Sequence, residues 1–469
     1  MFTIILLIMD KLNTKYIFAI SMVSALGGLL FGYDWVVIGG AKPFYEQFFN
    51  IASSPAVQGW AMSCALVGCL LGAMLSGMLS DRFGRKRLLI LSAALFIFSA
   101  VGTGASNTFN VFVFYRILGG IGIGLASNLS PMYIAEVAPG AIRGRFVSLN
   151  QLTIVIGILL AQLVNLQIAE PVAVDASDVG ILNSWNGQHG WRWMFWAENV
   201  PAGLFFILMF FVPESPRWLA KNGNEQNVLK TLRKIGGVKY AELAYAEIKE
   251  TLKSETGKVN FKHLFEPKLR GVLIIGIVLA AFQQWCGINV IFNYAQEVFA
   301  AAGYGVSDLL FNIVITGSVS LIFTFVAMYT VDKLGRRALM ILGAGGLGGI
   351  YAVMGGLYYF QVNGWPLLLF ILLAIACYAM SLAPVTWVVL SEIFPNKIRG
   401  AAMAVATFSL WAASFILTYT FPLLNKILGA SGTFWIYGII CFAGLVFITK
   451  KLPETKGKSL EELEKELVK

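Results

Sequence analysis

Long apolar segments recur along nearly the whole chain, and they constrain its fold more than any other feature. Each is about 20 residues long, the length at which an α-helix crosses the hydrocarbon core of a bilayer. Hydrophobic residues make up 58% of the 469 residues and charged residues only 13%. Because lipid offers the backbone no hydrogen-bond partners, we predict an all-α integral membrane protein with twelve spans. The predicted spans lie near residues 16–41, 57–80, 88–107, 109–131, 146–168, 193–212, 270–300, 306–331, 339–361, 365–390, 401–421 and 431–449.

Basic residues are concentrated in alternate loops between these spans. They occur in "SDRFGRKR", "DKLGRR" and "NKIRG", whereas the intervening loops carry only Lys42, Arg192 and Lys426. An excess of Lys and Arg is typical of the cytoplasmic loops of membrane proteins. The asymmetry predicts a multi-pass protein of the cell membrane with both termini in the cytoplasm. It also accounts for the net charge of +10 without a nucleic-acid partner.

The two halves of the chain repeat the same motifs in the same order. "DRFGRK" returns as "DKLGRR", "EVAPGAIRG" as "EIFPNKIRG", and "PESPR" as "PETKG". We expect two pseudo-symmetric six-helix halves, 1–213 and 270–451, with a cytoplasmic linker of short amphipathic helices over 214–269 and a cytoplasmic tail over 452–469. Duplicated bundles are typical of transporters that bind their substrate between two rocking halves. A channel or a scaffold would not need matched charged motifs.

A single carboxylate, Asp34, lies inside the first predicted span. A charge at the centre of a bilayer costs roughly 2.5–3.5 kcal/mol on insertion scales, so it needs a partner or a proton. Arg116 is the one clear base deep within a predicted span, and it lies at a depth similar to that of Asp34, roughly 10 Å from the outer face. Contact between them is therefore possible, either as a fixed ion pair or as a proton carrier.

Amide and indole side chains lie within the predicted spans. They are Gln151, Gln283, Gln284, Asn289, Asn293, Trp387 and Trp411. Amides bind the hydroxyl groups of a sugar and aromatic rings stack on its apolar faces. On an ideal helix Gln284 and Asn289 point about 140° apart, so they can face one ligand only if the helix bends, and Gly287 lies between them. Hydrogen bonding between helices is the alternative use of these amides.

Nine segments are similar to those of one family of membrane proteins. They are "GGLLFGYD", "DRFGRK", "YRILGGIGIGLASNLSPMYIAEVAPGAIRG", "NQLTIVIGILLAQ", "PESPRWL", "QQWCGIN", "DKLGRR", "WVVLSEIFPNKIRG" and "PETKG". On these segments the chain resembles the sugar porter family of the major facilitator superfamily, and in particular its bacterial xylose–proton symporters. The resemblance implies proton-driven import of a monosaccharide such as D-xylose or D-glucose by alternating access. It further implies the bacterial inner membrane, a functional monomer, no enzymatic activity and no cofactor besides the proton gradient.

The resemblance also assigns roles to single residues. It places Asp34, beside Arg116, at the proton-coupling acid of the symporters, where passive facilitators lack a carboxylate. Sugar-binding positions of the family fall on Gln151, Gln283, Gln284, Asn289, Trp387 and Trp411, and Phe31 falls on an aromatic that lines the cavity. Asn293, an amide that we also assign to the substrate, stands where the family has a gating tyrosine. Ile158, Leu410 and Ser320 replace polar residues of the xylose symporters, so the identity of the sugar stays open.

Charged residues of both signs flank the repeated cytoplasmic motifs. They are Asp81, Arg85, Glu136 and Arg143 in the first half and Asp332, Arg336, Glu392 and Arg399 in the second. In the family such residues form salt bridges that hold the outward-facing state. One exposed pair contributes only about 0–1 kcal/mol, but linked pairs could bias two states that lie within a few kcal/mol. The alternative is that these charges only fix the topology, which requires bases but no acids.

Three other functions compete with proton symport. Asp34 argues against a passive facilitator, and the amides of span seven argue against a drug–proton antiporter. A membrane sugar sensor would be expected to carry a long cytoplasmic signalling tail. We expect no metal site, because the two histidines, His189 and His263, fall in loops and the five cysteines fall inside apolar spans.

Overall fold

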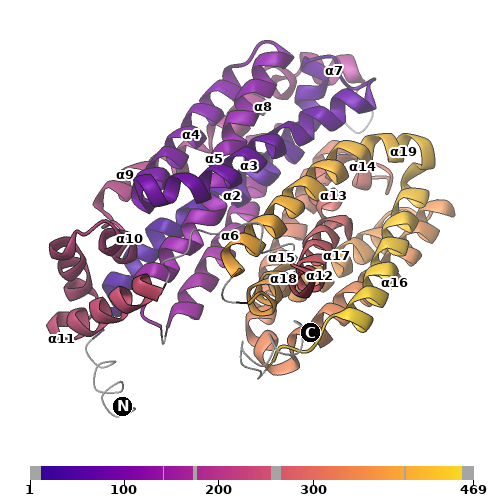
Figure 1. Ribbon diagram of the computed structural model, residues 1–469. Helices are drawn as coiled ribbons and strands as arrows, with labels where there is room; N and C mark the ends of the chain where they lie inside the picture. Colours follow the sequence, from indigo (N-terminus) through magenta and orange to yellow (C-terminus); the bar gives the residue numbers. More distant parts are fainter. Residues whose placement is uncertain (1–11, 141, 173–176, 255–265, 396–397, 457–469) are drawn as a thin grey trace.

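The computed structural model describes residues 12–140, 142–172, 177–254, 266–395 and 398–456, and within these ranges the secondary structure is helical, without strands. The first half contains α2 (Thr14–Phe48), α3 (Pro55–Phe83), α4 (Arg85–Ala105), α5 (Phe109–Val137), α6 (Arg143–Ile168), α7 (Asp178–Asn183), the π-helical turn η1 (Asn186–Gly190), α8 (Trp191–Trp196) and α9 (Asn199–Phe211). The connecting segments α10 (Pro216–Lys221) and α11 (Glu225–Ser254) follow, and α11 is divided by a kink at Gly236 and Gly237, whose backbone is not helical. The second half contains α12 (Pro267–Trp285), α13 (Ile288–Asn293), α14 (Ala295–Ala300), α15 (Val306–Leu334), α16 (Arg336–Tyr359), α17 (Trp365–Met380), α18 (Leu382–Ile393) and α19 (Arg399–Lys451). Figure 1 shows the two halves side by side.

Eleven segments of the described chain are long and apolar enough to cross a membrane. The last, Ala401–Lys451, has 51 residues, far more than the roughly 20 that one crossing needs. Its backbone leaves the helical region at Gly429, where φ is 66°, and Figure 1 shows α19 folding back on itself. The segment therefore makes two crossings, and the predicted total of twelve is confirmed.

Two of the predicted span limits are wrong. Span one does not end near residue 41, because α2 continues through Pro43 to Phe48. Lys42 and Glu46, one turn apart, form an ion pair that supports this extension. Span six begins earlier than residue 193, at Asn186, so Arg192 lies inside a helical segment and not in a loop.

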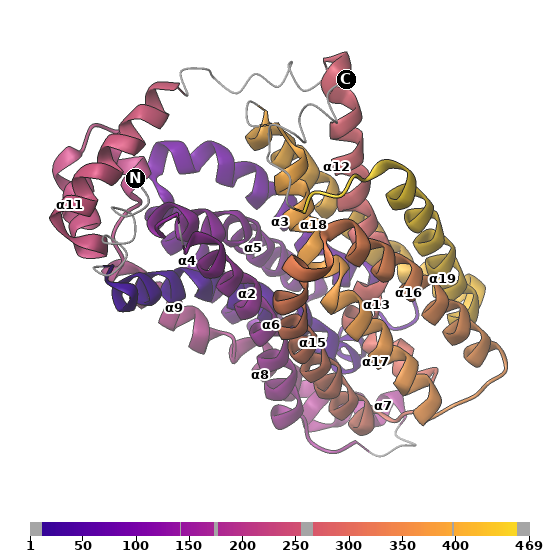
Figure 2. The ribbon, with the colours of Figure 1, turned by 90° about the horizontal axis from the view of Figure 1, so that it is seen from below.

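The two ends of the bundle differ. One end, which we call the motif end, carries the turns between α3 and α4 and between α15 and α16, together with α10 and α11 (Figure 1). The other end, which we call the opposite end, carries α7, α14 and the bend of α19. Val228, Leu232 and Ile235 of α11 pack against Ile17 and Ala138 of the first half. Figure 2, seen from below, accordingly shows α11 beside that half.

Glycines bring the helices of the first half into close contact. A Cβ added at Gly32 on α2 would lie 1.9 Å from the carbonyl oxygen of Ile154 on α6. A Cβ at Gly120 on α5 would lie 1.9 Å from the carbonyl oxygen of Ala65 on α3. Both clashes involve backbone, so any larger residue would push these helices apart. The first half is therefore tightly packed around α2 and α5, the helices that carry Asp34 and Arg116.

The halves meet through α3 with α19 and through α6 with α15. A Cβ at Gly59 on α3 would lie 2.3 Å from the carbonyl oxygen of Tyr419 on α19. On α15, a Cβ at Gly317 would lie 1.9 Å from Oε1 of Gln162 on α6. These contacts lie in the part of the bundle nearer the opposite end. The halves are thus packed together at that end.

Candidate functional site

Asp34 and Arg116 meet inside the first half. Nη1 of Arg116 on α5 donates a hydrogen bond to Oδ1 of Asp34 on α2. Both residues are buried, with exposed fractions of 1% and 2%. The contact that their similar depth made possible is therefore present. The role of the pair in carrying a proton stays a prediction.

The sequence reasoning missed a second carboxylate beside this pair. Glu198, which precedes α9, is 2% exposed and interacts electrostatically with both Asp34 and Arg116. Oδ2 of Asp34 and Oε1 of Glu198 are buried without a hydrogen-bond partner among the described residues. One guanidinium thus lies within electrostatic range of two carboxylates, and a bound proton would neutralise the group. Glu198 falls inside predicted span six, so the rule that singled out Asp34 would also have found it.

The predicted seventh span is broken at Gly287. α12 ends at Trp285 and α13 begins at Ile288, and Gly287 between them is left-handed, with φ 86°. A residue with a Cβ would be strained in this conformation. The break turns Asn289 toward Gln284, and Nδ2 of Asn289 donates a hydrogen bond to Gln284 Oε1 at 2.5 Å. The bend that these two amides require in order to face one ligand is therefore present.

Neighbouring amides extend this group. Nε2 of Gln284 donates to Oε1 of Gln283 at 3.3 Å, and Nε2 of Gln283 donates to the carbonyl oxygen of Ala383 at 3.2 Å. Gln283, Gln284 and Asn289 are all buried. The second of these bonds joins two segments of the second half, so interhelical bonding and ligand binding are compatible uses of the same side chains.

Aromatic rings from both halves meet near the centre of the bundle. Phe31 and Trp35 on α2 lie 5.7 Å and 6.0 Å from Trp411 on α19, measured between ring centroids. Phe31 and Trp35 themselves are 6.0 Å apart. The sequence reasoning named Phe31 and Trp411 but missed Trp35, although an aromatic one helical turn after Phe31 is expected to share its face.

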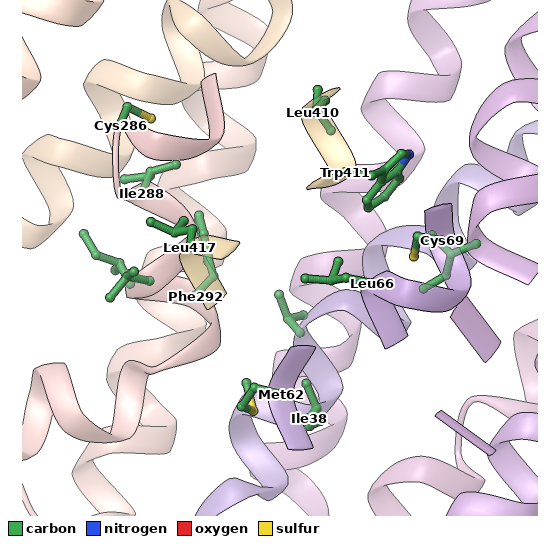
Figure 3. Packing of buried hydrophobic residues seen from close by; sticks show 14 of the residues in the cluster. Ile38, Met62, Leu66, Cys69, Cys286, Ile288, Phe292, Leu410, Trp411 and Leu417 are labelled. Carbon is green, nitrogen blue, oxygen red and sulfur yellow. The ribbon is translucent and has the colours of Figure 1, made fainter. Parts of the chain in front are cut away.

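A small cavity connects the ion pair with the second half. It is lined by Arg116 and Trp35 from the first half and by Asn293 at the end of α13. Met62, Leu66 and Cys69 on α3 form its apolar wall. Figure 3 shows these three side chains in the packed cluster that also contains Trp411. Oδ1 of Asn293 is buried without a hydrogen-bond partner in the described chain. The cavity thus brings the charged group and an amide of span seven to one space.

Two predicted sugar-binding residues are not joined to this group. Gln151 on α6 and Trp387 on α18 are half-buried. Among the described residues neither makes a hydrogen bond or a ring contact with the amides and aromatics named above. Their assignment to the substrate stays a prediction. The described residues also contain no group of three His, Cys, Asp or Glu side chains that could hold a metal ion.

The charged residues at the motif end form ion pairs within each half. Arg85 Nη2 lies 2.9 Å from Glu136 Oε1, and Arg85 Nη1 lies 3.7 Å from Asp81 Oδ1. In the second half Arg336 Nη2 lies 3.3 Å from Glu392 Oε1. Arg143 is exposed. The side chains of Asp332 and Arg399 lie outside the described part of the chain.

The third repeated motif provides a helix cap, which the sequence reasoning did not foresee. Glu214, in "PESPR", accepts hydrogen bonds from the backbone N–H groups of Arg85 and Lys86 at the start of α4. Glu454, in "PETKG", accepts those of Arg336 and Arg337 at the start of α16. Carboxylates at helix N-termini satisfy free N–H groups and the helix dipole. The repetition of the acid was the signal available in the sequence.

The pKa values of these two capping acids are shifted in opposite directions. Burial raises the pKa of Glu214, although backbone hydrogen bonds and Arg85 oppose this effect. Burial alone would also raise the pKa of Glu454, but its four backbone N–H donors lower it overall. The same motif therefore holds the pKa of its acid above the ordinary value in the first half and below it in the second.

The chain is similar to known transporters in sequence and in structure. The family model described as "Sugar (and other) transporter" matches residues 20–467. The chain is 43% identical to the D-xylose-proton symporter of Escherichia coli (strain K12), over 96% of each chain. It is 38% identical to the arabinose-proton symporter of Bacillus subtilis (strain 168), over 96% of this chain and 95% of the relative. A structure of the xylose transporter XylE from E. coli in an inward open conformation has a TM-score of 0.83 and 42% identity, covering 96% of this chain and 100% of that one. The chain belongs to the sugar porter family of the major facilitator superfamily.

Proposed function

We propose that this protein imports a monosaccharide together with protons by alternating access. The observation that carries the proposal is the buried Asp34–Arg116 pair, which has a second carboxylate, Glu198, beside it. A permanently charged group of this kind is costly at membrane depth, whereas a group that takes and releases a proton is neutralised in part of its cycle. Proton symport by the E. coli and B. subtilis relatives supports this assignment. A passive facilitator has no need of the acid.

The proton would act on the contact between α2 and α5. Ionised Asp34 holds Arg116 by a charge-assisted hydrogen bond, and protonation weakens that bond. Trp35, which follows Asp34 in the chain, contacts Trp411 of the second half. A change at Asp34 would therefore reach the interface between the halves through a single turn of α2.

The sugar would bind between the halves, beside the broken span. Gln283, Gln284 and Asn289 provide donors and acceptors for hydroxyl groups, and Trp411 provides an apolar face. Phe31, Asn293, Gln151 and Trp387 complete the proposed site. D-xylose is the first substrate to test, because a D-xylose-proton symporter is among the relatives. D-glucose and L-arabinose are the competitors to include.

The motif end would face the cytoplasm, because the basic loops lie there. The opposite end, where the halves are packed together, would then face outside, and the structure would be inward-facing. The likeness to an inward open transporter supports this orientation. In this arrangement residues 1–213 and 270–451 move as the two halves, 214–269 links them, and 452–469 is a cytoplasmic tail.

The motif-end charges would hold the outward-facing state. When that end closes, the charged residues of each half approach those of the other half. Arg85 and Glu136 could then form ion pairs across the interface with Arg336 and Glu392. We expect the protein to work as a monomer in the bacterial inner membrane, without a cofactor.

Uptake into proteoliposomes tests this function. Vesicles with wild-type protein should concentrate labelled D-xylose when the outside is made acidic, and they should only equilibrate it without a pH gradient. Asp34→Asn should abolish concentration while counterflow exchange persists, because exchange needs no net proton movement. Full uphill uptake by Asp34→Asn would refute the role of Asp34.

A further inference from the structure

A second buried charge cluster lies at the opposite end of the bundle. Lys42 on α2 is 1% exposed, although it is a lysine in an apolar bundle. Its Nζ lies 2.9 Å from Oε1 of Glu46 on the same helix and 2.5 Å from Oε1 of Glu297 on α14. Among the side chains that the structure describes, the pair with Glu297 is the ion pair that joins the two halves.

Glu46 and Glu297 are attached to different halves of the molecule. Nε2 of Gln58 on α3 donates a hydrogen bond to Glu46 Oε2 at 3.1 Å, so Glu46 is tied to the first half. Glu297 belongs to the second half, in the short helix that follows the broken span. If the halves separate at this end, Lys42 loses Glu297 and keeps Glu46. A buried ammonium group must keep a partner, and Glu46 provides it in both states.

The two carboxylates also differ in their access to water. The Glu46 side chain is 4% exposed, whereas that of Glu297 is 22% exposed. A polar cavity of about 340 Å³ borders the cluster, and Gln58, Gln296 and Lys426 help to line it. Glu46 and Glu297 both line this cavity, and Glu297, the more exposed of the two, can be hydrated once it is released. This asymmetry suits a contact that forms and breaks in each cycle.

We propose that Lys42 is an exchangeable latch that holds the opposite end closed. Lys42 binds Glu297 when the halves meet at that end and is retained by Glu46 when they part. Glu297 is the closing partner and Glu46 is the resting partner. This proposal rests on alternating access between the halves, but it does not depend on which group carries the proton.

The two carboxylates make the latch testable, because their removal should have opposite effects. Spin labels at Ser53→Cys and Ala301→Cys, both exposed and located at the opposite end of different halves, report the separation of the halves by double electron–electron resonance. Cys377 is replaced by alanine in this background, since the other four cysteines are buried. Lys426→Met is the matched control, because it removes an exposed cation that lines the same cavity.

Glu297→Gln should raise the ratio of open to closed molecules about tenfold, because only the closed state loses an ion pair. Glu46→Gln should lower that ratio, because the open state then leaves Lys42 without a charged partner. If Glu46→Gln fails to fold, Gln58→Leu takes its place in the test. Gln58→Leu removes the hydrogen bond that holds Glu46, so it should shift the ratio in the same direction. Lys426→Met should leave the ratio unchanged.

A merely structural cluster would give a different result. Shifts of both carboxylate variants in the same direction, or no shift in either, would overturn the latch. Proton-driven uptake by the wild-type protein is measured alongside. A failed latch with intact uptake rejects this inference alone, whereas absent uptake rejects the proposed function.

Discussion

The molecule buries two charge clusters on the same helix, and they differ in which parts of the protein they join. Asp34 pairs with Arg116, and both belong to the first half. Lys42, two turns further along α2, pairs with Glu297 of the second half. Tight backbone contacts hold α2 and α5 within one half, so relative motion of the halves leaves the first pair together. The same motion must break the second pair.

This difference indicates a division of work. A charge pair inside one half stays together when the halves move, so its contact can respond to protonation, which is what a proton carrier needs. A pair that crosses the interface responds to motion and not to protons, which is what a latch needs. The first cluster has two acids and a base and meets a small cavity with an apolar wall at Arg116, whereas the second lines a larger polar cavity.

Removing the cation from each cluster is the strongest way to break this contrast. Arg116→Leu should lower the free energy of unfolding by about 3–5 kcal/mol, because it leaves Asp34 buried and uncompensated. Lys42→Met should cost less, since Glu46 and Glu297, the two carboxylates it leaves, both line a polar cavity. Denaturant unfolding in mild detergent measures both. The double variant Asp34→Asn with Arg116→Leu should regain most of the stability lost in Arg116→Leu. Equal losses of stability in Arg116→Leu and Lys42→Met would contradict the distinction between the clusters.

Removal of the amide pair at the broken span should have the next largest effect. Gln284→Ala should raise the Kd for the sugar about tenfold, because it removes a hydrogen-bonding group and releases Asn289. Asn289→Ala should have a similar effect, and the two losses should not add, because the side chains are bonded to each other. Titration with labelled sugar measures the Kd of each single variant and of the double variant Gln284→Ala with Asn289→Ala. Additive losses would show that the pair does not act as a unit.

Much of this architecture follows from the sequence, and the exceptions share a physical cause. Segment length predicts twelve spans, depth predicts that Asp34 can touch Arg116, and the angle between Gln284 and Asn289 predicts the bend at Gly287. Each of these rules concerns one helix or its position in the bilayer. Which helices meet across the interface is not local information.

The residues that the sequence reasoning missed illustrate this limit. Lys42 was assigned to a loop, because the first predicted span ends near residue 41, yet α2 continues to Phe48. Its partner Glu297 is far away in the sequence. Glu198 and Glu297 lie inside predicted spans six and seven, so the rule applied to Asp34 would have singled out both, and Trp35 was within reach of the rule applied to Phe31.

Trp35, which is adjacent to Asp34 of the first cluster, tests whether that cluster is connected to the sugar site. Trp35→Ala should weaken sugar binding severalfold, because contacts between aromatic rings contribute about 0.5–1.5 kcal/mol beyond burial. Trp35→Phe is the control and should retain most of the affinity. Uptake kinetics at saturating and limiting sugar measure the effect. Unchanged affinity in Trp35→Ala would separate Trp35 from the sugar site.

The smallest expected effect concerns the two helix caps at the motif end. The raised pKa of Glu214 means that its stabilising effect is present in acid and is lost as the pH rises through its folded pKa. The lowered pKa of Glu454 means that its effect is present at neutral pH and is lost as the pH falls through its folded pKa. Glu214→Gln should therefore reduce the Tm more in acid, and Glu454→Gln more at neutral pH. Melting curves across this range test the opposite signs, and parallel curves would contradict them.

Proton movement during sugar flux tests the role of Asp34 most directly. Proteoliposomes that enclose a pH indicator receive sugar outside, with no imposed pH gradient and with the membrane potential clamped. Wild-type protein should acidify the interior as sugar enters, and Asp34→Asn should transport sugar down its gradient with no change in internal pH. Sugar entry through the wild-type protein without acidification, or equal acidification with Asp34→Asn, would contradict the account.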